Sequence, residues 1–193
     1  MTDFNNHSHT KQTIRKILSR KREQLSHTER EQYSFHITET LLSLDIIAKA
    51  NRVHCYMSFG SEVSTSLLME VLFSQKKQVY VPVVHDDILL HAQVNSGTQW
   101  DKDFFGIPTP IAPTISTHAM MLHDNDCIII PMLGFDSQCM RLGYGKGYYD
   151  KFLPETKGIK IGLAFSCQYY DYIPADSHDI PMNCIITETQ IFS

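Results

Sequence analysis

Apolar positions near the start of the chain recur every three or four residues, which is the spacing of one face of an α-helix. They predict a helix over residues 10–25 with the apolar stripe Ile14, Ile17, Leu18 and Leu25. Residues 1–9 are polar and predict a flexible tail. Lys11, Arg15 and Arg22 flank the stripe, since residues four apart share a helix face. These cations form either a solvated basic surface or the edge of a site that holds an anion.

A second helix is expected to begin at the capping box Ser26-His27-Thr28-Glu29 and to continue to about residue 43. Short apolar runs further along the chain are typical of strands. They predict strands at residues 53–57, 78–84, 88–94, 126–131, 159–164 and 184–187. Further helices are expected at residues 65–74, capped by Ser64, and at residues 147–153.

The order of these elements predicts an α/β fold. A strand, a helix and a second strand within residues 53–84 have the spacing of a βαβ unit with parallel strands. We therefore expect a single domain over residues 1–193, with three layers: an open, mostly parallel, Rossmann-like sheet and helices on both faces. Ligands in such sheets bind beyond the carboxyl ends of the strands. The long irregular segment 95–123 is expected to be functional or mobile.

Composition and charge narrow the class of function. The chain has 42% apolar residues, 20% charged residues and a formal net charge of −4, which gives no general attraction to nucleic acid or to an anionic membrane. It shows no hydrophobic signal core and no apolar run of membrane-spanning length, so we expect a cytoplasmic protein. The five cysteines include no CxxC pair and predict free thiols in a reducing compartment. We expect a monomer that acts on small molecules and binds neither nucleic acid nor membrane.

The glycine-rich stretch 141–150, Arg-Leu-Gly-Tyr-Gly-Lys-Gly-Tyr-Tyr-Asp, is the strongest candidate for chemistry. Glycines at alternate positions let the backbone turn sharply, and free N–H groups before a helix form an anion site. The spacing is neither that of a P-loop nor that of the dinucleotide fingerprint. The stretch predicts a cradle for a polyphosphate; the alternative is a tight turn with no ligand.

The charged residues of this stretch suggest separate roles. Arg141 can hold a phosphate with two parallel hydrogen bonds, whereas Lys146 supplies a mobile point charge. Asp150 follows the loop and is placed to hold a divalent cation near the phosphates. Glu62 follows the carboxyl end of another expected strand, so Glu62 and the glycine stretch are expected to share one crevice.

These motifs, taken in order, carry a resemblance to a known family. Pro131-x-x-x-Phe135-Asp136 followed by the glycine stretch closely resembles the 5-formyltetrahydrofolate cyclo-ligases, also called methenyltetrahydrofolate synthetases. The likeness spans nearly the whole chain. The segment 57–63, Met-Ser-Phe-Gly-Ser-Glu-Val, is similar to the family's folate-binding segment. Shorter matches are Lys11-x-x-x-Arg15, the run 105–108 (Phe-Gly-Ile-Pro) and the run 178–181 (His-Asp-Ile-Pro).

The resemblance implies an ATP- and Mg²⁺-dependent conversion of 5-formyltetrahydrofolate, with or without a polyglutamate tail, to 5,10-methenyltetrahydrofolate, with release of ADP and phosphate. The formyl oxygen is phosphorylated to an imino-phosphate before N10 closes the ring. We expect Arg141, Lys146 and Tyr149 to be catalytic and Asp150 and Asn183 to bind the metal; Lys146 and Asp150 rest on the chemistry of the glycine stretch. The expected substrate contacts are Met57, Glu62, Trp100 and Tyr148, of which Trp100 is chosen for its flat aromatic ring. The implied ATP contacts are Lys11, Arg15, Arg141, Gly143, Gly145, Lys146, Gly147, Tyr148 and Tyr149.

Three positions depart from the family pattern, and other functions stay open. Thr109 stands where the family commonly has a glutamate, Asn183 stands where it commonly has a metal-binding aspartate, and Lys146 stands where many relatives have glycine. One alternative is a phosphate- or CoA-binding isomerase or transferase of related fold, without ATP chemistry. A second is a non-enzymatic module that binds nucleic acid through the basic first helix, which the net acidity disfavours.

Overall fold

The computed structural model describes residues 10–85, 88–103, 106–111, 114–116, 122–177 and 179–193; the expected tail, residues 1–9, lies outside them. The first two helices begin as the sequence predicts. Thr10 caps the first by accepting a hydrogen bond from the Thr13 amide, and the capping box of Ser26 and Glu29 is present at the second. The helices are α1 (Lys11–Glu23), α2 (His27–Ser43), α3 (Asp45–Lys49), α4 (Ser66–Ser74) and α5 (Tyr148–Phe152), with short 3-10 turns η1 (Leu153–Glu155) and η2 (Ser166–Gln168).

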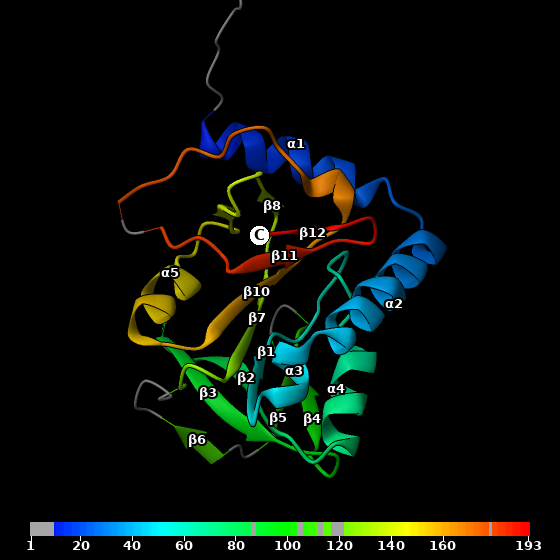
Figure 1. Cartoon of the computed structure of the whole chain (residues 1–193), viewed down its shortest axis with the longest axis vertical. Coiled ribbons are helices and arrows are strands. Elements are labelled where there is room, and N and C mark those ends of the chain that lie inside the picture. The colour runs from blue at the N-terminus through cyan, green and yellow to red at the C-terminus, as the bar shows by residue number, and fades with distance from the viewer. Residues whose placement is uncertain (1–9, 86–87, 104–105, 112–113, 117–121, 178) are drawn as a thin grey trace, which may run out of the picture.

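An eight-stranded sheet in the order β12-β11-β10-β7-β1-β2-β3-β6 forms the centre of the molecule (Figure 1). Its strands are β1 (Arg52–Cys55), β2 (Gln78–His85), β3 (Ile88–Val94), β6 (Thr114–Ser116), β7 (Cys127–Pro131), β10 (Ile159–Leu163), β11 (Cys184–Ile186) and β12 (Ile191–Phe192). The pairs from β11 through β10, β7 and β1 to β2 are all parallel. Antiparallel pairs occur only toward the two edges of this sheet. The expected open, mostly parallel α/β sheet is confirmed.

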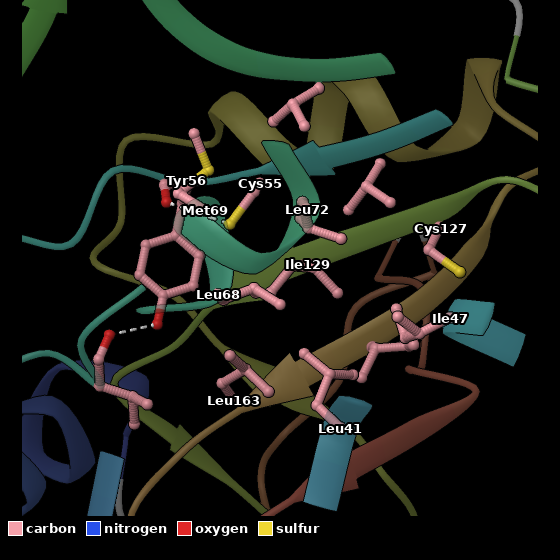
Figure 2. Packing of buried hydrophobic residues seen from close by; sticks show 14 of the residues in the cluster. Leu41, Ile47, Cys55, Tyr56, Leu68, Met69, Leu72, Cys127, Ile129 and Leu163 are labelled. Atoms are coloured by element: carbon pink, nitrogen blue, oxygen red, sulfur yellow. Dashed lines mark hydrogen bonds between the residues drawn. The ribbon is translucent and has the colours of Figure 1, made fainter. Parts of the chain in front are cut away.

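Helices cover both faces of the sheet. Successive side chains of β7 point to opposite faces and are apolar on both, so each face packs against helices. Cys127 and Ile129 face α2, α3 and α4, where they pack with a large apolar cluster shown in Figure 2. In that cluster the buried Tyr56 hydroxyl donates to the Val63 carbonyl at 2.7 Å. Ile128 and Ile130 face the other way, toward the cluster that holds residues of α5 and η1. The three layers expected from the sequence are therefore present.

The helix α1 crosses the carboxyl end of the sheet (Figure 1). Its buried Ile14 and Leu18 pack against Leu133, Leu142 and Ile173, which all lie outside the eight-stranded sheet. A Cβ on Gly134 would lie 2.1 Å from the Cδ1 atom of Leu18, so this approach depends on glycine. The packing brings the basic side chains of α1 to the edge where ligands of parallel sheets bind.

Several local predictions were wrong. The N-cap of α4 is Thr65 rather than Ser64, and the Thr65 hydroxyl donates instead to the Tyr56 carbonyl at 3.0 Å. Segment 95–123 was expected to be irregular, but it contributes β6 and a hairpin of β4 (Trp100–Lys102) with β5 (Pro108–Pro110). The hairpin of β8 (Gly134–Phe135) with β9 (Arg141–Leu142) was also missed, as was β12. Strands of two or three residues have too few positions to show an alternation.

Within the described residues, no helix is long and apolar enough to cross a membrane.

Candidate active site

The glycine stretch forms a turn that is fastened to α1. Arg15 of α1 donates from Nε to the Gly143 carbonyl at 2.8 Å, although 128 residues separate them. Gly145 has φ +97°, and a Cβ there would lie 3.3 Å from the Arg15 Cζ atom. Gly147 has φ +72° and caps the short helix α5. The sharply turning backbone expected from the sequence is present, and Gly145 is required both for its positive φ and for the close approach of Arg15.

Arg141, at the start of this stretch, is oriented by two of its other members. Its guanidinium forms an ion pair with Asp150 and lies 5.5 Å from the centroid of the Tyr149 ring. The Arg141 side chain is only 6% exposed, whereas that of Asp150 is 33% exposed. Lys146 is exposed at the tip of the turn. Arg141 is thus a fixed cation and Lys146 a mobile one, both beside the same turn.

Tyr149 presents a buried polar atom to this region. Its hydroxyl has no hydrogen-bond partner among the described residues. Burial raises the pKa of the Tyr149 phenol, so the hydroxyl stays protonated and can donate at neutral pH. An unpartnered buried donor is costly in a folded protein unless a ligand or water satisfies it. Tyr149 is therefore suited to contact a bound substrate.

Lys11, the first residue of α1, is tied to the segment before β11. Its ammonium lies 2.5 Å from an Asp176 oxygen and 2.6 Å from an Asp179 oxygen. Burial lowers the pKa of Lys11, but the hydrogen bonds and charges of the two aspartates outweigh this and raise it on balance. Since an ammonium carries three donors, Lys11 can keep one partner and still reach an anion at the end of α1.

Glu62 and the glycine stretch, which were expected at the same edge of the sheet, lie in direct contact. The Tyr144 hydroxyl donates to one Glu62 oxygen at 2.6 Å, and the Phe59 amide donates to the other at 3.0 Å. Burial raises the pKa of Glu62, while the hydrogen bonds from Tyr144 and Phe59 and the charge of Arg22 act to lower it. Glu62 is a carboxylate in a partly dry setting, held by donors on both oxygens.

Met57 and Trp100 also lie together. They line one open hollow of about 560 Å³ whose other walls are Asp101, Lys102 and Pro108. Met57 follows β1, whereas Trp100 begins the hairpin of β4 and β5. Trp100 has an aromatic face that suits a flat ligand. The structure thus brings together Met57, a substrate contact that the family resemblance implied, and Trp100, which was expected for its aromatic ring.

The two expected metal ligands have different surroundings. Asn183 is exposed and directly precedes β11; its side-chain oxygen accepts a hydrogen bond from the Lys160 amide at 2.8 Å. Asp150 carries the one carboxylate of the glycine stretch and pairs with Arg141. Among the described residues, no group of three His, Cys, Asp or Glu side chains forms a ready metal centre. A single carboxylate can suffice for Mg²⁺ where phosphates are also bound, because Mg²⁺ keeps several waters and binds one or two carboxylates together with substrate phosphates.

Arg22 and Tyr144 were given no separate role in the sequence analysis, but they contact each other and Tyr144 contacts Glu62. Arg22, treated as part of a basic helix flank, is 6% exposed and donates to the Ser61 hydroxyl at 2.9 Å. It also donates to the Tyr144 hydroxyl at 2.7 Å. The one available signal was the helical spacing that places Arg22 on the same flank as Lys11 and Arg15. Two matched positions, Phe105 and His178, lie outside the described residues.

Comparisons with known proteins agree with one another. The model of the 5-formyltetrahydrofolate cyclo-ligase family matches residues 7–188. A 5-formyltetrahydrofolate cyclo-ligase of Haemophilus influenzae is 30% identical over 178 residues, covering 89% of this chain and 94% of the relative. The mouse protein of the same name is 28% identical over 189 residues, covering 92% of this chain and 93% of the relative.

Solved structures of similar proteins share the fold. The 5,10-methenyltetrahydrofolate synthetase of Aquifex aeolicus has a TM-score of 0.81 and 31% identity, covering 94% of this chain and 91% of that one. A 5,10-methenyltetrahydrofolate synthetase of Mycoplasma pneumoniae has a TM-score of 0.69 and 26% identity, covering 92% of this chain and 98% of that one.

Proposed function

Because this chain belongs to the 5-formyltetrahydrofolate cyclo-ligase family and is a ligase, we propose that it uses ATP and Mg²⁺ to convert 5-formyltetrahydrofolate to 5,10-methenyltetrahydrofolate. ADP and phosphate are the other products. The observation that carries the proposal is the contact between Glu62 and Tyr144, since it joins a polyphosphate-type glycine turn to a carboxylate suited to a pterin.

The reaction must convert the formyl oxygen, which is a poor leaving group, into a phosphate, which is a good one. The formyl oxygen attacks the γ-phosphorus of ATP, the bond from that phosphorus to the bridging oxygen breaks, and ADP leaves. The product is an imino-phosphate on N5. N10 then attacks the activated carbon and loses its proton, and phosphate departs with the former formyl oxygen. Such a sequence needs positioning and charge neutralisation more than covalent help from the protein.

The nucleotide half of the site is proposed to consist of the glycine turn and one end of α1. Gly143, Gly145 and Gly147 let the phosphates approach the backbone, and Tyr148 begins the helix whose N-terminus follows the turn. Arg141 and Lys146 neutralise the charge of the transferred phosphoryl group. Lys11 and Arg15 hold the far side of the nucleotide.

Mg²⁺ would be held by Asp150, with Asn183 as a second, uncharged oxygen ligand. Bound there, it supplies charge neutralisation for the nucleotide phosphates. Asp150 thereby has two duties, because it also orients the Arg141 guanidinium. The Asn183 oxygen, which accepts from the Lys160 amide, keeps a second lone pair for a ligand.

The folate half of the site is proposed to start at Glu62, whose carboxylate accepts two hydrogen bonds from the amino-pyrimidinone edge of the pterin. Met57 and Trp100 contact the flat part of the substrate along the hollow that they line. Tyr148 contacts folate from the glycine stretch. The Tyr149 hydroxyl donates to the formyl phosphate, which satisfies its unpartnered state.

An assay that follows the absorbance of the methenyl product tests this function directly. Protein, Mg·ATP and 5-formyltetrahydrofolate are mixed, and we expect growth of the methenyl absorbance together with one ADP per product. The competing isomerase or transferase without ATP chemistry predicts no ADP release that depends on the formyl-folate. Product formation without ATP would also overturn the proposal.

A further inference from the structure

Tyr144 lies at the middle of a hydrogen-bond chain that the proposed reaction does not use. Its hydroxyl accepts a hydrogen bond from the Arg22 guanidinium at 2.7 Å and donates one to Glu62 at 2.6 Å. The Arg22 Cζ atom also lies 5.6 Å from the centroid of the Tyr144 ring. Three residues that are far apart in sequence therefore meet at one phenol.

The direction of these two hydrogen bonds is fixed by the chemistry of Arg22 and Glu62. A guanidinium only donates, and an ionised carboxylate only accepts, so the phenol must accept from Arg22 and donate to Glu62. Partial burial and the Glu62 charge raise the pKa of the Tyr144 phenol, which therefore remains protonated. Distances of this length are typical of hydrogen bonds to charged groups, which are about twice as strong as neutral ones.

Arg22 and the segment around Tyr144 are each held by further contacts. Arg22 lies on α1, is 6% exposed and also donates to the Ser61 hydroxyl at 2.9 Å. Tyr144 stands between Gly143, whose carbonyl is held by Arg15, and Gly145, against which the Arg15 guanidinium packs. A shift of the glycine turn relative to α1 must therefore move the donor that points at Glu62.

We propose that Tyr144 is a positioning residue that couples the two halves of the site, so that a nucleotide bound at the glycine turn fixes Glu62 for folate. The proposal rests on the proposed function, since it assumes nucleotide at the turn and folate at Glu62. Coupling of binding is reciprocal: each ligand tightens the other by the same factor. Tyr144 as a residue is 48% exposed, so its effect comes from the hydroxyl and not from a place in the core.

Calorimetry tests the coupling on the full chain. The dissociation constant of 5-formyltetrahydrofolate is measured with and without a non-hydrolysable ATP analogue and Mg²⁺. In the wild type we expect the analogue to tighten folate about fivefold or more, within the usual range of allosteric coupling. In Tyr144→Phe the factor should fall to about one, while affinity for the analogue alone stays within about twofold. Tyr172→Phe removes the hydroxyl of a tyrosine that is 62% exposed and is the matched control.

A second readout separates positioning from a structural role. Loss of the Tyr144 donor leaves Glu62 less favoured as a carboxylate, so the acid limb of folate binding should move to higher pH in Tyr144→Phe. Arg22→Lys keeps the charge but replaces the two guanidinium nitrogens that reach Ser61 and Tyr144 separately by a single ammonium nitrogen, and it should lose the coupling as well. The Arg22→Lys variant provides the test of coupling if Tyr144→Phe fails to fold.

The outcomes are distinct. Full coupling in Tyr144→Phe or Arg22→Lys overturns the inference, as does a wild type that binds both ligands with no coupling. A wild type that binds no folate and forms no methenyl product refutes the proposed function instead.

Discussion

Arg141 and Asp150 form an ion pair that joins the two ends of the glycine stretch across nine residues. The Tyr149 ring lies beneath the same guanidinium. The pair leaves Arg141 with further donors and Asp150 with a second oxygen, so one phosphate and one cation can be added without breaking it. The two charges that the proposed reaction needs next to ATP are therefore already held at a fixed distance.

Arg141→Ala should damage ATP use much more than folate binding. Loss of a charge-assisted contact costs about 1.5–3 kcal/mol, which corresponds to roughly ten- to a hundred-fold in apparent ATP affinity or turnover. Steady-state kinetics with each substrate varied in turn measure the effect on the ATP KM and on the folate KM separately. Arg20→Ala removes an exposed cation of α1 and is the control. Unchanged ATP kinetics in a folded Arg141→Ala protein would remove Arg141 from the site.

Glu62→Gln should raise the folate KM and leave the ATP KM nearly unchanged. The amide replaces one acceptor oxygen by a donor, so either the Phe59 amide, the Tyr144 hydroxyl or the pterin meets a donor instead of an acceptor. We expect about a tenfold or larger rise in folate KM. The same two-substrate kinetics provide the check. A defect confined to ATP or to Mg²⁺ would place Glu62 with the metal.

Stability should fall as the pH drops below about 6.5, because two histidines are buried as neutral rings. His54 and His91 are 0% and 4% exposed, and their ring nitrogens lie 3.0 Å apart. Burial lowers the pKa of His91 to about 4, and burial followed by the nearby His91 lowers that of His54 well below its usual value. In acid, the two histidines therefore bind protons in the unfolded chain but not in the folded chain, and this difference favours unfolding.

Between pH 7.5 and pH 5, His91 alone should remove about 2 kcal/mol from the free energy of unfolding. Urea titrations at the two pH values measure the change. His91→Gln removes one of the two rings and should reduce the difference by about 2 kcal/mol, even if the variant is less stable at both pH values, because His54 still contributes. His123→Gln, at an exposed position, should keep the wild-type difference. An equal pH dependence in all three proteins would contradict the prediction.

Asn183→Asp should lower the Mg²⁺ concentration needed for half-maximal activity. Metal affinity at oxygen sites rises with the charge of the ligands, and an aspartate can still accept the Lys160 amide hydrogen. A Mg²⁺ titration of both proteins at saturating ATP and folate measures the shift. If Asn183 only caps the entry to β11, the variant will keep the wild-type Mg²⁺ dependence and a stability within about 0.5 kcal/mol.

The sequence by itself determined the features that depend on near neighbours. The capping box at Ser26, the buried strand Cys127–Pro131 and the sharp turn at Gly145 and Gly147 all follow from spacings of a few residues. The order of strands and helices determined the parallel sheet as well, because a βαβ unit has one favoured connection. The carboxyl-end rule then placed Glu62 and the glycine stretch at the same edge.

Tertiary structure alone decided which partner each charged side chain has. Lys11 meets Asp176 across 165 residues, Arg22 meets Tyr144 across 122 and Tyr144 meets Glu62 across 82. Periodicity reports that a residue lies on a helix flank, but it carries no information on what that flank faces. The packing of α1 over the carboxyl end of the sheet, where Leu18 fits against Gly134, decided that Arg22 is a buried side chain that donates to Ser61 and Tyr144.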